Sequence, residues 1–162
     1  INLGTLSDAG LFVLIILMFI GASPGSTGGG IKTTTFFVLM QEVRCIFTKG
    51  RPGAFHRRLP ENALAKAATV ALLGVIVVCT GTFLLCVLEP EATFIQLLFE
   101  DVSAFGTVGL STGITSGLRD LSKFVLILTM YTGRVGAFTL LSIWVERPAP
   151  LARYTEEAIT IG

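Results

Sequence analysis

Glycine, lysine and threonine gather in one short stretch of this chain, GASPGSTGGGIKTTT, at residues 21–35. Glycine-rich turns beside a lysine and a hydroxyl side chain are typical of loops that bind phosphate through backbone amides. The best-known nucleotide loop of this kind needs the spacing G-x-x-x-x-G-K-[ST]. Here Ile31 separates Gly30 from Lys32, so the spacing differs by one residue. The stretch therefore does not predict nucleotide binding by this chain.

A second stretch rich in glycine and hydroxyl side chains, GTVGLSTGITSG, occupies residues 106–117. Glu100 and Asp101 precede it, and their carboxylates allow two interpretations. They could attract cations at an outer surface, or they could be bonded to neighbouring backbone. The third feature is Arg134, a single charge inside an apolar segment. A charge in such a segment is costly and normally faces a cavity or a partner.

The composition indicates the environment of these residues. The chain of 162 residues is 52% hydrophobic and 14% charged, whereas soluble domains carry about 25% charged residues. An integral membrane protein in contact with the lipid bilayer is the prediction. Three cysteines without C-x-x-C spacing argue against a disulfide framework or a metal site. No cofactor is predicted in this chain, and no feature suggests binding to nucleic acid.

Three hydrophobic segments are expected to be helical. The first covers about residues 10–40 and is broken at 21–35, the second runs over 67–88, and the third over about 124–145. Between the first two, the linker 41–65 carries five Lys or Arg residues against two Glu. Basic loops of this length stay cytoplasmic. The linker and the C-terminal tail, 147–162, are therefore assigned to the cytoplasm.

The connection between the second and third segments resembles a pore element. A spanning helix at 66–88 would be followed by a short re-entrant helix at 92–105, a glycine-threonine strand at 106–111 and a second spanning helix at 120–146. This order is the M1–P–M2 unit (helix, pore helix, helix) of potassium-channel-like pores. The alternative is an extracellular amphipathic helix followed by a glycine-rich surface loop. Irregular backbone at membrane depth is tolerated where it lines a cavity or is buried in protein.

An internal repeat extends this interpretation. Shifted by 112 residues, segment 6–21 aligns with segment 118–133, and eight of sixteen positions are identical. Residues 1–40 would therefore end with the M2 helix of a preceding unit, broken by the stretch 21–35. The chain is expected to be a fragment that holds one whole unit, 66–146, and the end of another. It cannot form a pore alone.

Three motifs, in this order, resemble the Trk/Ktr/HKT superfamily of potassium transporters, and within it the KtrB/NtpJ-type membrane subunits. They are GASPGSTGGGIKTTTF (21–36), SAFGTVGLSTG (103–113) and MYTGRVGAFTL (130–140). The resemblance covers essentially the whole chain. It implies an all-α integral membrane protein of four M1–P–M2 repeats. This chain would be a C-terminal fragment with the end of the third repeat and all of the fourth.

The resemblance implies a selectivity filter for potassium in which backbone carbonyls replace the hydration shell of the ion. The filter residues would be Thr107, Val108, Gly109, Leu110 and Ser111. The backbone of the first three would hold K⁺. Glycine at position 109 would permit the unusual dihedral angles that such a strand needs.

The resemblance also implies an intramembrane gate below the filter, formed by Ser23, Pro24, Gly25, Ser26, Thr27, Gly28, Gly29 and Gly30. Backbone groups freed by the break would be satisfied by the hydroxyls of this loop or by pore water. Arg134 would lie beside the gate as a positive barrier to cations. Lys32 would belong to the gate or anchor the following helix.

Potassium uptake through the plasma membrane is the function that the resemblance implies, with no enzymatic activity. Sodium is a candidate coupling ion, and the sequence leaves its role open. The implied partners are a second copy in a homodimer and a cytosolic nucleotide-binding ring of the RCK/KTN type. The competing hypothesis is a non-conducting membrane module or membrane-bound enzyme whose glycine loop contacts phosphate. A symmetric two-span channel fits poorly, because the two M2 segments differ.

Overall fold

Helices form most of the regular structure in the computed structural model, which describes residues 3–48, 53–54, 57–58 and 63–136. The elements are η1 (Leu3–Thr5), α1 (Asp8–Phe19), α2 (Thr33–Thr48), β1 (Gly53–Ala54), β2 (Arg57–Arg58), α3 (Ala63–Leu88), α4 (Phe94–Gly106), η2 (Thr115–Gly117) and α5 (Asp120–Val135). The strands β1 and β2 form a small antiparallel pair in the predicted linker, with Gly53 opposite Arg58. Residues 137–146 of the predicted last helix and the tail 147–162 lie outside the described residues.

Helix α3 is the long element of the fold. Among the described residues it is the one helix long and apolar enough to cross a membrane, with 26 residues, while the apolar helix α1 is shorter. At about 1.5 Å per residue, α3 would exceed the roughly 30 Å thickness of a bilayer core. Its large apolar side chains Leu72, Phe83 and Val87 are more than half exposed. An apolar surface of this extent fits contact with lipid or with further protein.

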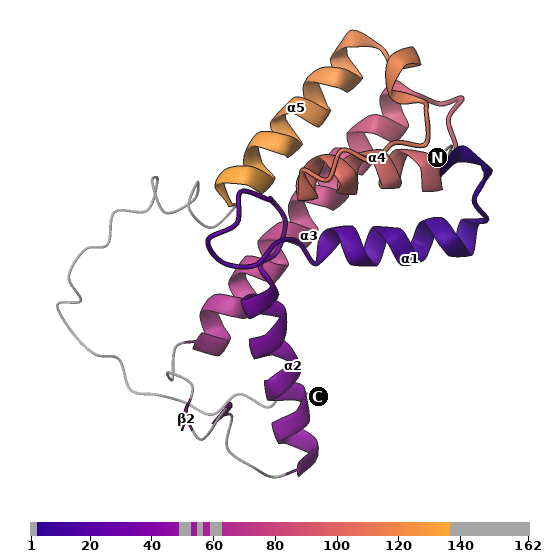
Figure 1. Cartoon of the computed structure of the whole chain (residues 1–162). Helices are drawn as coiled ribbons and strands as arrows, with labels where there is room; N and C mark the ends of the chain where they lie inside the picture. The colour runs from indigo at the N-terminus through magenta and orange to yellow at the C-terminus, as the bar shows by residue number, and fades with distance from the viewer. Residues whose placement is uncertain (1–2, 49–52, 55–56, 59–62, 137–162) are drawn as a thin grey trace, which may run out of the picture.

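Helix α4 is the buried centre of the fold (Figure 1). It packs against α1 on one side and against α3 and α5 on the other. Every residue from Phe99 to Gly106 is buried, including two carboxylates. The helix begins after Thr93, whose backbone N–H donates to the side-chain oxygen of Gln96 at 3.2 Å. With 13 residues, α4 is too short to cross a bilayer.

Two apolar clusters hold the helices together. One joins α1, α3 and α4 and contains Leu11, Ile15, Met18, Ile31, Val78, Phe99, Val102 and Phe105. The other joins α3, α4 and the outer part of α5, and contains Leu85, Leu97, Ala104, Leu118 and Leu126. Both clusters include α4 residues. Helix α4, which carries the turn that follows it, is therefore packed in both clusters.

The internal repeat corresponds to two helices that start alike and end differently. Asp8 is the first residue of α1, and Asp120, at the matching position of the repeat, is the first of α5. Helix α1 ends at Phe19, before the glycine at 21, whereas α5 continues through the matching Gly133 to Val135. The sequence similarity therefore ends where the structures diverge, because proline and three consecutive glycines disfavour helix after residue 21.

Gly133 marks the closest approach of α5 to α4. A Cβ atom at this position would overlap the carbonyl oxygen of Phe105 at the end of α4. Since that oxygen belongs to the backbone, it cannot move aside as a flexible side chain would. A glycine at residue 133 thus sets how closely the two helices approach.

Gly133→Ala is expected to destabilise the full-length protein by about 1–3 kcal/mol, the usual cost of overpacking. The measurement is thermal unfolding of the purified protein in detergent. Gly10→Ala is the matched control, because a Cβ there would meet only side chains, at 3.4 Å or more. Both substitutions replace a helical glycine by alanine, which favours helix, so the two variants differ only in the contacts of the added Cβ. If both variants unfold at the wild-type temperature, the close approach of α5 to α4 is contradicted.

Glu89 joins the C-terminal end of α3 to the N-terminal end of α5. Its Oε1 accepts hydrogen bonds from the backbone N–H of Arg119 and the hydroxyl of Ser122, both at 2.7 Å. These two bonds, the first above all, lower the pKa of Glu89 below its ordinary value of 4.5. The carboxylate therefore links the two helices in its charged form.

Stability is expected to fall in acid because of this link. A carboxylate whose pKa is lowered by folding stabilises the fold above its unfolded pKa, and this contribution is lost as pH falls through the folded pKa. Melting temperatures measured between about pH 7 and pH 3 should drop below roughly pH 4.5. Glu89→Gln should flatten this drop, whereas the exposed Glu91→Gln should keep it. Equal slopes for both variants would refute the assignment.

Candidate functional site

The break between α1 and α2 is a closed loop whose two ends lie side by side. Ile20 and Ile31 form an isolated parallel bridge. The N–H of Gly21 donates to the carbonyl of Ile31 at 2.8 Å, and the N–H of Ile31 donates to the carbonyl of Phe19 at 3.2 Å. Much of the backbone hydrogen bonding that the helix break leaves open is thus made within the loop. Of the predicted hydroxyl partners, Ser26 accepts from the N–H of Gly28 at 3.3 Å.

Residues 27–29 of this loop touch the ends of α4 and α5. The N–H of Gly29 donates to the hydroxyl of Thr107 at 2.8 Å. A Cβ on Gly29 would lie 2.8 Å from the carbonyl oxygen of Phe105 and 3.1 Å from that of Gly133. Glycine is therefore the residue that fits. Figure 1 shows the loop beside the C-terminal end of α5.

Two basic side chains hold the same part of the loop. Nη1 of Arg134 donates to the carbonyl of Thr27. Nζ of Lys32 donates to the carbonyl of Gly28 at 2.8 Å. Hydrogen bonds from charged donors are stronger than neutral ones. Both cations therefore bind backbone oxygens that the helix break leaves free.

The rest of the predicted gate loop lies away from these contacts. Four of its residues, Ser23, Pro24, Gly25 and Ser26, are exposed and form a turn in which the N–H of Ser26 donates to the carbonyl of Ser23 at 3.0 Å. The fifth, Gly30, lies against the other end of the loop, where a Cβ on it would be 3.0 Å from the Cα of Gly21. Gly25 has a φ of 86° and open space around it. Of the eight predicted loop residues, Thr27, Gly28 and Gly29 are therefore those in contact with α4, α5 or a basic side chain.

The turn after α4 contains the predicted filter residues. Thr107 has a left-handed backbone with φ of 51°, the one non-glycine residue with positive φ among those described. The N–H of Val108 donates back to the carbonyl of Ser103 at 3.0 Å. Gly109 has a φ of 80°, which favours glycine. The chain therefore reverses at the end of α4 and presents Val108 and Gly109 as its exposed edge.

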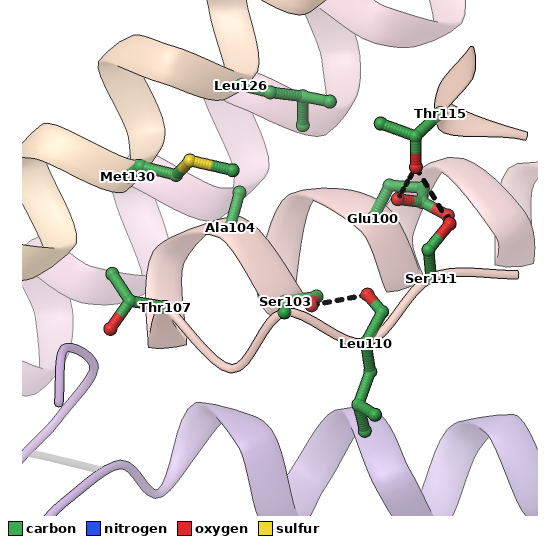
Figure 2. A pocket seen from close by; sticks show the side chains of 10 residues that line it. Glu100, Ser103, Ala104, Thr107, Leu110, Ser111, Thr115, Leu126 and Met130 are labelled. Atoms are coloured by element: carbon green, nitrogen blue, oxygen red, sulfur yellow. Dashed lines mark hydrogen bonds between the residues drawn. The ribbon is translucent and has the colours of Figure 1, made fainter. Parts of the chain in front are cut away.

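The following residues are tied back to α4 rather than presented outward. The hydroxyl of Ser103 donates to the carbonyl of Leu110 at 2.6 Å. Figure 2 shows this bond beside a cavity of about 320 Å³, which lies behind the turn and reaches Leu126 and Met130 of α5. The five predicted filter residues thus divide into Thr107, which caps the end of α4, an exposed edge, 108–109, and a pair held against the helix, 110–111.

Glu100 holds that pair in place. Its carboxylate is only 4% exposed and accepts hydrogen bonds from the hydroxyl of Ser111 at 2.7 Å and the hydroxyl of Thr115 at 2.7 Å (Figure 2). Asp101 is fully buried and accepts from the hydroxyl of Thr82 at 3.1 Å. Both carboxylates are thus buried. The bonds of Glu100 come mainly from hydroxyls, with one backbone N–H, that of Thr112, whereas Oδ1 of Asp101 has no partner among the described residues.

Three contributors to this network were not singled out from the sequence: Ser103, Thr112 and Thr115. One signal could have found them. A carboxylate in an apolar helix must find donors when it is buried, and the stretch after residue 110 is rich in Ser and Thr. The pairing itself is not visible in the sequence, because the partners lie 7 to 15 residues apart along an irregular chain.

A second cavity lies on the other side of the turn. It has a volume of about 420 Å³ and extends between α1, the start of the loop and the turn after α4. Its lining includes Met18, Gly21, Gly28, Gly106 and Val108. The exposed edge of the turn and the loop therefore border the same hollow.

Comparisons with known proteins agree with this arrangement. Residues 1–150 match the family described as TrkH, cation transport protein. The chain is 38% identical to "Ktr system potassium uptake protein D" of Bacillus subtilis, over all of this chain and 36% of that protein. It is also 38% identical to "Potassium/sodium uptake protein NtpJ" of Enterococcus hirae, over 97% of this chain and 36% of that protein.

A third relative is "Ktr system potassium uptake protein B" of Vibrio alginolyticus, 35% identical over all of this chain and 36% of that protein. The chain thus spans about a third of the length of the curated relatives it matches. Such similarity over nearly the whole chain excludes an enzyme family. The chain belongs to the TrkH family of cation transport proteins.

Proposed function

We propose that the protein is the ion-conducting subunit of a potassium uptake system in the plasma membrane. The observation that carries the proposal is the junction between the loop and the turn. The N–H of Gly29 donates to Thr107 at the start of the turn, and Arg134 holds the carbonyl of Thr27. A filter directly above a closed gate would have such a junction.

In this proposal α3, α4 and α5 are one M1–P–M2 repeat, with α4 as the re-entrant pore helix. The repeat would occupy 66–146 of the chain. Helix α1, the loop and α2 would be the broken M2 helix of the preceding repeat, within 1–40. The short, buried α4 between α1, α3 and α5 supports the assignment. So does the shared start of α1 and α5.

The filter would act through the backbone of Thr107, Val108 and Gly109. Carbonyl oxygens from four such turns would replace the water around a potassium ion. Helix α4 ends at this turn, so the negative end of its dipole would favour a cation there. Transport then needs positioning and charge, with no covalent chemistry.

The gate would be the loop 21–35, closed in this structure. Its residues 27–29 would block the path below the filter, and the guanidinium of Arg134 would add a positive barrier for cations. Lys32 would stabilise the closed loop through its bond to Gly28. Opening would require the loop to leave both α4 and α5.

Potassium is the proposed transported ion, as the names of the relatives suggest. Sodium is a candidate coupling ion, and one relative is named for uptake of both ions. The linker 41–65 and the C-terminal tail would lie in the cytoplasm. The proposed assembly is a homodimer on a cytosolic nucleotide-binding ring. Relatives named as potassium uptake proteins of a Ktr system support a chain that works within a larger assembly.

The full-length protein tests the proposal in a bacterium that lacks potassium uptake. Wild type should restore growth at low potassium and take up potassium in a direct flux measurement. An empty vector is the control for background growth. If the protein reaches the membrane but moves no potassium, the proposed function is wrong.

A further inference from the structure

The carboxylate of Glu100 is buried in the middle of α4, and its surroundings explain why it can be there. A buried carboxylate is strongly destabilising unless hydrogen bonds replace its water. Four donors do so: the hydroxyl of Ser111 at 2.7 Å, the N–H and the hydroxyl of Thr112 at 2.9 and 3.1 Å, and the hydroxyl of Thr115 at 2.7 Å. All four belong to residues 111–115, a segment that begins at the last predicted filter residue, Ser111.

The turn itself is also fixed on α4, through Ser103. Ser103 receives the N–H of Val108 on its carbonyl, and its hydroxyl donates to the carbonyl of Leu110. Glu100 and Ser103 are adjacent on one face of the helix, since they are three residues apart. Ser103 therefore holds the turn at Val108 and at Leu110, on both sides of Gly109, and Glu100 holds the chain from Ser111 onward.

We infer that Glu100 is a positioning residue that sets the ion selectivity of the turn. The inference rests on the proposed function. Selectivity by backbone carbonyls depends on how many oxygens surround the ion and where they are held. Glu100 does not reach the exposed edge itself, but it anchors the chain immediately after it. Without this anchor, the two bonds of Ser103 alone hold the turn, so residues 108–109 move more freely relative to α4 and accommodate a smaller ion.

The four donors are neutral groups and differ in how they can be removed. Thr115→Val deletes one hydroxyl and keeps the shape of the side chain, the charge of Glu100 and the other three bonds. Glu100→Val deletes the whole anchor. Glu100→Gln keeps the shape and an acceptor oxygen, and the hydroxyl of Thr115 can rotate to accept from the new amide. These variants separate anchoring from charge.

The experiment measures potassium and sodium fluxes of the full-length protein in lipid vesicles. We expect Glu100→Val to lower the potassium-to-sodium flux ratio about tenfold, equivalent to about 1.4 kcal/mol. Thr115→Val should lower it by roughly threefold, equivalent to about 0.6 kcal/mol. Glu100→Gln should keep most of the wild-type ratio. The double variant with Glu100→Val and Thr115→Val should not fall below Glu100→Val alone.

The matched controls are Glu91→Gln, an exposed glutamate on the same connection, and Thr80→Val, an exposed threonine that donates within α3. Both should keep the wild-type ratio. A merely structural role of Glu100 would reduce folding and both fluxes together, without changing their ratio. Thermal unfolding of each variant identifies that case, and Thr115→Val provides the test if Glu100→Val does not fold.

Two failures are distinguishable. If wild type conducts potassium selectively and both Thr115→Val and Glu100→Val keep the wild-type potassium-to-sodium flux ratio, the inference alone is overturned. A correctly inserted wild-type protein that conducts no potassium contradicts the proposed function, and the inference with it.

Discussion

Gly109→Asp is expected to abolish potassium uptake by the full-length protein. The residue has a φ of 80° and nothing within 4 Å of an added Cβ, so conformation rather than space requires glycine. A side chain there costs about 1–2 kcal/mol in the left-handed region. The larger effect is on the ion path, since the substitution places a carboxylate on the exposed edge of the turn. A carboxylate would bind the cation and displace the carbonyls that should replace its water.

The measurement is growth at low potassium and initial uptake rate in a strain without other potassium uptake. Gly117→Asp is the matched control, because it is also an exposed glycine with open space but without positive φ. It should retain uptake within about twofold, as expected for a surface change. Uptake by Gly109→Asp at the wild-type rate would exclude residue 109 from the filter.

Arg134→Ala is expected to raise potassium flux about tenfold. The substitution removes the hydrogen bond from the guanidinium to the carbonyl of Thr27. A hydrogen bond to a charged group contributes about 1.5–3 kcal/mol, and each 1.4 kcal/mol shifts an equilibrium about tenfold. Removing the positive charge also lowers the barrier for cations in the path. Both effects favour an open, faster pathway.

Flux from vesicles that contain the purified full-length protein measures this effect. Arg134→Lys should fall between wild type and alanine, because lysine keeps the charge but lacks the planar, multi-donor guanidinium. Arg119→Ala, at the outer start of the same helix, should leave flux unchanged. A flux that stays at the wild-type level in Arg134→Ala would count against a role for this residue in the gate.

The helices could be predicted from the sequence because each carries local signals. Asp8 and Asp120 mark helix starts, and the apolar run before Glu89 corresponds to most of α3. The pore helix was predicted at 92–105 and α4 runs over Phe94–Gly106. The linker was assigned from residue 41, whereas α2 continues to Thr48. Boundaries differ by a few residues because capping depends on contacts that a sequence does not display.

The contacts of the candidate site were less predictable. The family resemblance implied that Arg134 lies beside the loop, and the structure has a hydrogen bond from Arg134 to the carbonyl of Thr27. The link between Gly29 and Thr107, 78 residues apart, depends on how α1 packs against α4. The bonds of Glu100 depend on the path of an irregular segment with three glycines within eight residues, 106–113. Neither follows from local propensity.

The hydrogen bond between Gly29 and Thr107 has a thermodynamic consequence for the proposed mechanism. Thr107 is both the first residue of the turn and the acceptor that holds the loop. The loop cannot leave without freeing this hydroxyl, so opening changes the environment in which an ion binds. Linkage is reciprocal: an ion that shifts Thr107 must change the stability of the closed loop by the same free energy. A bound potassium ion would then regulate the passage of potassium, because it would act as substrate and effector at the same residue.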